Sequence, residues 1–139
     1  MLAVKHYDRQ YIDGCRARID AQVSSYRDLV MAARKQVGAD EPIFYNNMVL
    51  ILDRYFVHRT RNIEGKDGGP LNEVRMLCNS MIHNHDVMSA NSTIKYDPAR
   101  SVLKYEVGDE IRLDEAAFLL LFEAFIADLE AKFLATGSG

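Results

Sequence analysis

The sequence predicts a mainly α protein, a four-helix up-down bundle with a small β-hairpin between the third and fourth helices. Three observations lead to this class. Apolar residues recur at steps of three and four along four separate segments. Glycine and proline residues separate these segments. One stretch, residues 93–107, changes to the pattern of strand, turn and strand. With 139 residues, 48% of them hydrophobic and 27% charged, the chain suits one soluble globular domain.

The first two helices are expected over residues 6–36 and 41–61. Gly38 marks the end of the first, and Asp40 caps the second, with Pro42 in its first turn, where a missing N–H costs little. The second helix is apolar on nearly every side, which indicates a central position. The apolar seam of the first helix consists of Ile12, Cys15, Ile19, Val23, Tyr26, Val30, Ala33 and Val37.

The third helix is expected over residues 70–88, beginning at Pro70 after a glycine-rich loop. The hairpin follows: TIKY and SVLKYEV flank a type I turn at Asp97-Pro98, and EIRL forms a short third strand after a turn at Gly108-Asp109. Asp114 caps the last helix, residues 114–135. The inward stripe of that helix consists of Phe118, Leu121, Phe122, Phe125, Leu129 and Phe133.

Residues 1–135 are therefore expected to form a single helical domain, and residues 136–139 a disordered tail.

The net charge of −3 excludes a nucleic-acid binder of the strongly basic kind. Two distant cysteines, no signal peptide and no apolar run of about 18 residues predict a cytoplasmic protein without a membrane span. Basic residues gather in residues 1–36 and acidic residues in residues 106–130, either because packed helices or subunits match in sign or because both faces are solvated.

One polar row stands out on the third helix. Arg75, Asn79 and His83 are spaced by four residues, so a helix places them on one side. An imidazole can move protons near neutral pH, and a guanidinium can hold a phosphate through two hydrogen bonds. The row is a candidate catalytic site. The alternative is that it is simply the solvent-exposed side of an amphipathic helix.

A second row, on the second helix, is a candidate ligand-binding site. Arg54, His58 and Arg61 follow a spacing of four and three and could contact phosphate oxygens. The alternative is a solvated helix end, where the helix dipole favours basic residues. Within a helix, His83 and His85 would point about 200° apart and could not share a metal ion, whereas a helix that ends near residue 84 would allow them to converge. No metal and no cofactor is expected.

The segment CNSMIHN, residues 78–84, resembles the mark of the HEPN family. HEPN domains are small helical bacterial domains, many of them RNA-cutting toxins, with Arg-Asn-x-x-x-His near the end of a helix, followed by a short hairpin and a final helix. Asn79 and His83 match the asparagine and the histidine, and Cys78 stands where the family has arginine. The resemblance covers residues 70–135. It implies that the arginine would stabilise charge at the scissile phosphate and the histidine would assist at the 2′-oxygen.

Because a cysteine cannot replace that arginine, we expect a catalytically weak or inactive HEPN-like module for binding or assembly, with RNA or a nucleotide as a candidate ligand. One alternative is a metal-independent ribonuclease that is active as a dimer. Another is a purely structural homo-oligomeric helical protein. A homodimer is expected, since the seam of the first helix and the apolar second helix exceed what one small bundle would bury.

Overall fold

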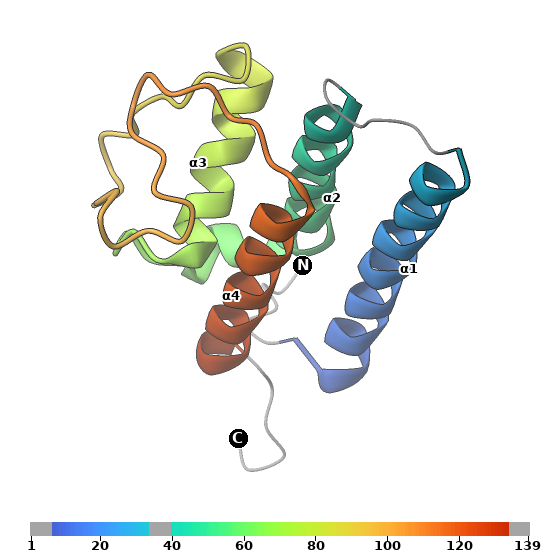
Figure 1. Cartoon of the computed structure of the whole chain (residues 1–139). Helices are drawn as coiled ribbons and strands as arrows, with labels where there is room; N and C mark the ends of the chain where they lie inside the picture. Colours follow the sequence, from blue (N-terminus) through green and yellow to red (C-terminus); the bar gives the residue numbers. More distant parts are fainter. Residues whose placement is uncertain (1–6, 34–39, 134–139) are drawn as a thin grey trace.

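The computed structural model describes residues 7–33 and 40–133, without the side chains of residues 33, 40, 57–63 and 133. Successive helices alternate in direction and form the expected up-down bundle (Figure 1). The predicted tail, residues 136–139, lies outside the described residues. None of the described helices combines the length and the apolar composition that a membrane span requires. The four helices are α1 (Arg9–Ala33), α2 (Asp40–Ile63), α3 (Pro70–His83) and α4 (Glu115–Phe133).

Side-chain caps set the start of the first and last helices. The carboxylate of Asp8 accepts the backbone N–H of Tyr11 at 2.8 Å, so α1 begins at Arg9 and not at residue 6. The carboxylate of Asp114 accepts the N–H of Ala117 at 2.8 Å, as predicted. The predicted end of the first helix, residues 34–36, lies outside the described residues.

The core lies around α2, which contacts all three other helices and thereby confirms its predicted central position. The predicted stripe of α4 is buried at every described side chain, from Phe118 to Leu129, and only that of Phe133 is not described. The seam of α1 is buried from Ile12 to Val23. The buried apolar side chains of α2 are Tyr45, Met48, Val49, Leu52 and Phe56.

Helices α1 and α4 are joined across the bundle by ion pairs. Arg9 pairs with Glu130, Arg16 with Glu123, and Arg27 with Glu115 at 2.6 Å. The start of one helix thus faces the end of the other, as antiparallel neighbours require. Sign matching between packed helices of one chain therefore accounts for part of the uneven charge of the sequence. All six side chains are partly exposed, so each pair contributes little alone.

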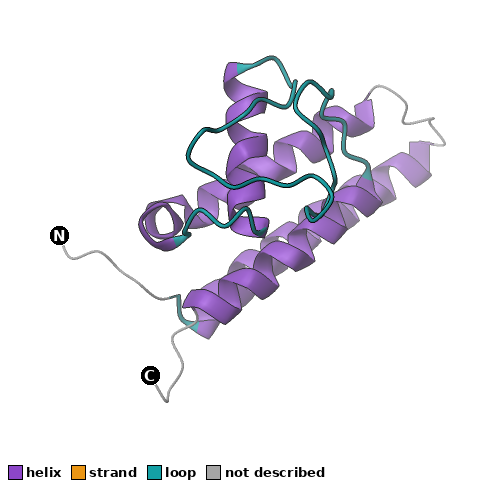
Figure 2. Cartoon of the chain, turned by 90° about the vertical axis from the view of Figure 1, so that its left-hand side faces the viewer, coloured by secondary structure: helices purple, strands orange, loops and turns teal. Residues whose placement is uncertain are grey.

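The predicted β-hairpin is wrong. Residues 84–114 form a long loop against α3 (Figures 1 and 2), and the β pairing described in this loop is an isolated antiparallel bridge between Val87 and Glu110. The buried carboxylate of Glu73 accepts the N–H groups of Val102 and Leu103, which takes the donors that a strand ladder would use. Lys104 has a φ of 61°, which a strand cannot contain.

The two predicted turns of this loop are confirmed. Arg100 donates its backbone N–H to the carbonyl of Asp97 at 3.0 Å, and Asp109 donates to Glu106 at 3.0 Å. The side chain of Asp97 also accepts the N–H of Ala99, which fixes the first turn locally. Short-range turn chemistry was therefore readable from the sequence, although the pairing between the strands was not.

Candidate functional site

Helix α3 carries the first predicted row on its outer side. Leu71, Val74 and Cys78 are buried against the core, whereas Arg75 and Asn79 are half-buried and His83 is exposed. The helical spacing thus holds, and the three candidate catalytic side chains lie on the polar side of α3.

Arg75 is occupied by an ion pair within the protein. Its Nη1 lies 2.6 Å from Oε1 of Glu64, a carboxylate on a residue that is only 3% exposed. The other oxygen of Glu64 accepts a hydrogen bond from Nδ2 of Asn72 at 3.0 Å. Turning Arg75 toward a phosphate would break its bond to this buried carboxylate, and a buried carboxylate that loses its cationic partner is costly.

Cys78, at the arginine position of the HEPN pattern, belongs to the core. It is 2% exposed, and its Sγ donates to the carbonyl oxygen of Val49 in α2 at 3.6 Å. A side chain at this position points toward α2 and not toward the outer side where Asn79 and His83 lie. The core role that its spacing indicated is confirmed.

Helix α3 ends at His83 and not at residue 88 as predicted. Asn84 donates its N–H to the carbonyl of Ser80 at 2.9 Å, and its side chain donates to the carbonyl of Val87 at 2.7 Å. His85 and Asp86 have φ values of 54° and 63°, a left-handed conformation that cannot continue the helix. The described residues contain no cluster of three or more His, Cys, Asp or Glu side chains that could hold a metal ion.

In the second predicted row, the structure describes the side chain of one of the three residues. Arg54 is exposed on α2, whereas the side chains of His58 and Arg61 lie outside the described residues. Among the described side chains, Arg54 makes no hydrogen bond or ion pair with Arg75, Asn79 or His83. No hydrogen bond or ion pair between described side chains therefore joins the two rows.

The glycine-rich loop before α3 directs its amides at the protein's own side chains. Gly69 donates to the carboxylate of Asp67 and Gly68 to Oδ1 of Asn72, both at 2.9 Å. A loop that cradles a phosphate needs such N–H groups free for the ligand. The amides of this loop serve instead to fix the connection between α2 and α3.

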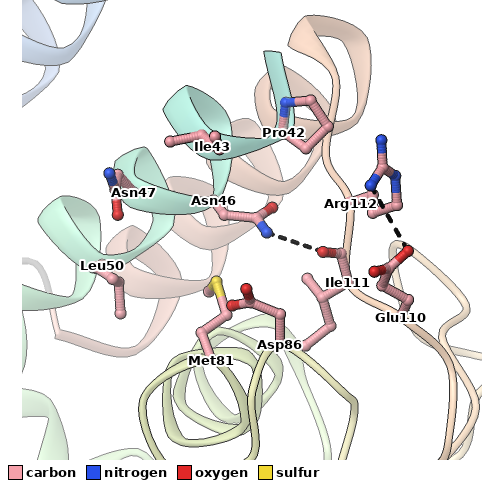
Figure 3. A pocket seen from close by; sticks show the side chains of 10 residues that line it. All are labelled: Pro42, Ile43, Asn46, Asn47, Leu50, Met81, Asp86, Glu110, Ile111 and Arg112. Carbon is pink, nitrogen blue, oxygen red and sulfur yellow. Dashed lines mark hydrogen bonds and ion pairs between the residues drawn. The ribbon is translucent and has the colours of Figure 1, made fainter. Parts of the chain in front are cut away.

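A cleft of about 390 Å³ opens between α2, the end of α3 and the loop segment 110–112 (Figure 3). This volume is within the usual range of ligand pockets. Its apolar part comes from Ile43 and Leu50 of α2 and Met81 of α3. None of the predicted site residues whose side chains the structure describes, Arg54, Arg75, Asn79 and His83, lines it. The described residues that line it are Pro42, Ile43, Asn46, Asn47, Leu50, Met81, Asp86, Glu110, Ile111 and Arg112.

Charges in this cleft are unequally compensated. Arg112 pairs with Glu110 at 3.6 Å. Asp86 points into the cleft beside Met81, and its exposed carboxylate makes no hydrogen bond or ion pair with any described residue (Figure 3). Asn46 is 9% exposed. Its side-chain amide donates to the carbonyl of Ile111 at 2.8 Å and accepts the N–H of Leu113 at 3.1 Å, so it holds the loop segment against α2.

The sequence contains one weak signal of this cleft. Asn46 interrupts the apolar side of the second helix, and a buried amide there must have found a partner. Nothing local indicates that this partner is the backbone near Ile111, 65 residues further along the chain. A site assembled from three distant segments could not be found by motif spacing.

The fold places the chain in the broad class of antiparallel four-helix proteins. No known family model, no curated protein and no solved structure matches the chain.

Proposed function

We propose that this chain is a non-catalytic, HEPN-like helical module whose role is binding or assembly. The observation that carries the proposal is the ion pair between Arg75 and Glu64. It places the charge of the only guanidinium in the row on α3 against a buried carboxylate, beside an imidazole at His83 and an amide at Asn79. Electrostatic stabilisation of the transition state is commonly the largest part of catalysis, so such a row is a poor nuclease site.

Burial of Cys78 supports the same proposal. The position that carries arginine in the HEPN pattern faces the core here, and an arginine could enter it only as a buried charge. The open cleft beside Asp86 supports a binding role, because it offers a concave surface with apolar and charged groups.

The experiment that tests the proposal is a cleavage assay with end-labelled single-stranded RNA at low salt in the presence of EDTA. We expect no more cleavage by the natural sequence than by His83→Ala. Circular dichroism of both proteins serves as the control for folding. Cleavage that persists in EDTA and disappears in His83→Ala would favour the alternative, a metal-independent ribonuclease.

Contact with RNA or a nucleotide through Arg54, His58, Arg61 and the row on α3 stays a prediction. If it occurs, its affinity should fall steeply with added salt, because phosphate contacts release counterions. A filter-binding titration at two salt concentrations measures this dependence. An absence of affinity at low salt would leave the structural homo-oligomer as the alternative.

The homodimer also stays a prediction. The apolar surfaces of α1 and α2 on which it was based are largely buried within one chain, since Ile12, Ile19, Met48 and Leu52 are each at most 1% exposed. Ile43 and Ile82 remain exposed, at 64% and 62%. Light scattering across micromolar concentrations decides between monomer and dimer.

A further inference from the structure

We propose that the cleft lined by Ile43, Leu50, Met81 and Asp86 binds a short peptide segment of a partner protein in which Lys or Arg stands beside an aliphatic residue. The inference rests on the proposed binding role and names the chemistry of the partner. The cleft combines an apolar surface, an uncompensated carboxylate and a backbone that is held in place around both.

The apolar surface suits aliphatic side chains. Ile43 is 64% exposed, and Leu50 and Met81 are half-buried at the same cleft. Methionine is flexible and polarisable, so Met81 can adapt to side chains of different shape. The aliphatic stem of a lysine or arginine can also lie on such a surface while its charged end remains in water.

The charge of the cleft selects a cation. Among the described lining residues, the only basic one is Arg112, which is paired with Glu110, so Asp86 is the uncompensated charge of this part of the cleft. A guanidinium or ammonium group of a peptide would complete this carboxylate with charge-assisted hydrogen bonds. A phosphate of RNA would meet two carboxylates and one paired arginine on a chain of net charge −3, so the observations favour a basic peptide over RNA.

The position of Asp86 is fixed before a ligand arrives. Its carbonyl oxygen accepts the N–H of Ile111 at 2.7 Å, and the segment after Ile111 is held to α2 by Asn46. Both walls of the cleft are thereby fastened to each other. A cleft that is already formed loses less conformational entropy on binding.

The test is a titration of the isotope-labelled protein with the peptide Gly-Leu-Arg-Leu-Gly, followed by NMR. We expect chemical-shift changes at Asn47, Met81 and Asp86, with weaker binding as salt is added. The peptides Gly-Leu-Glu-Leu-Gly and Gly-Ser-Arg-Ser-Gly test the charge and the apolar contact separately. Both should bind more weakly than the arginine-leucine peptide.

Asp86→Asn is the decisive variant, because asparagine accepts the left-handed backbone conformation at this position. We expect its Kd for the arginine-leucine peptide to rise about fivefold. Asp20→Asn is the matched control, since Asp20 is exposed on α1 and does not line the cleft. It should leave the Kd unchanged.

Equal binding of the glutamate peptide, no shift in the cleft, or an unchanged Kd in Asp86→Asn would overturn the inference. So would an RNA oligonucleotide that perturbs the cleft where the peptide does not. These outcomes are separate from failure of the proposed function, which is measured by RNA cleavage. A protein that neither cuts RNA nor binds the peptide keeps the proposed non-catalytic role and loses this partner.

Discussion

Glu73 in α3 and Val102 in the long loop are joined by a hydrogen bond of 2.8 Å from the backbone N–H to the carboxylate. The other oxygen of Glu73 accepts the N–H of Leu103 at 2.9 Å. Glu73 is 1% exposed, and burial raises the pKa of its carboxyl above the usual value near 4.5, although the two N–H groups act in the opposite direction. One carboxylate thus fastens the loop to the bundle.

Because this pKa is raised in the folded state, the contribution of Glu73 to stability is fully present below the unfolded pKa of about 4.5 and is lost as pH rises through the folded value. We expect the free energy of unfolding of the natural protein, minus that of Glu73→Gln, to fall as pH rises from about 4.5. Urea unfolding of both proteins across this window measures the difference. A difference that grows with pH would show that the N–H groups outweigh burial.

Asn46→Ala should destabilise the protein, because it leaves the carbonyl of Ile111 and the N–H of Leu113 without their buried partner. The expected loss is about 1–3 kcal/mol. Asn47→Ala is the control on the next residue, which is exposed and should change stability by no more than about 0.5 kcal/mol. Equal urea midpoints for the two variants would mean that the connection from α2 to this segment contributes nothing.

Phe122→Ala should cost about 3–5 kcal/mol, whereas Glu123→Ala should stay within about 0.5 kcal/mol. Phe122 is fully buried and stacks on Phe118 at 5.9 Å between ring centroids. Glu123 is an exposed side chain whose ion pair with Arg16 is screened by solvent. Chemical denaturation compares them, and a larger loss for Glu123→Ala would mean that the ion pairs between α1 and α4 dominate this contact.

The helices could be predicted because the spacing of their apolar residues is a local pattern of the sequence. The bundle, the central α2 and the stripe of α4 all follow from periods of three and four residues. The end of α3 was missed because Met88 falls in phase with the helix and is also buried, at 1% exposure, although it lies in the loop. Periodicity cannot distinguish these two reasons for burial.

The hairpin and the site depended on distant partners. Residues 93–107 have the composition of strands, but Glu73, almost thirty residues earlier, accepts the N–H groups of Val102 and Leu103. Spacing alone placed Arg75 in a polar row, yet Glu64 lies across the glycine-rich loop and binds it. In both cases a buried carboxylate binds donors that the sequence pattern had assigned to another role. The spacing of residues along the chain does not show which donors such a carboxylate contacts in the fold.

Cys78→Arg brings the HEPN pattern and the packing of α3 into direct conflict. The substitution restores the arginine of the pattern, but it places a charge where the side chain is 2% exposed and faces Val49. We expect a loss of about 3 kcal/mol or more in the free energy of unfolding, since the new guanidinium would be buried without a carboxylate partner.

Asn79→Arg is the control for this substitution, because it adds the same side chain one residue later at a half-buried position on the polar side of α3. It should remain folded, with a change of no more than about 1 kcal/mol. Urea midpoints and RNA cleavage in EDTA are measured for both variants. A folded Cys78→Arg protein that cuts RNA, and loses this activity when His83→Ala is added, would contradict the expected disruption. It would mean that α3 can turn or shift to present residue 78 beside His83, and that the segment CNSMIHN is a catalytic motif lacking only its arginine.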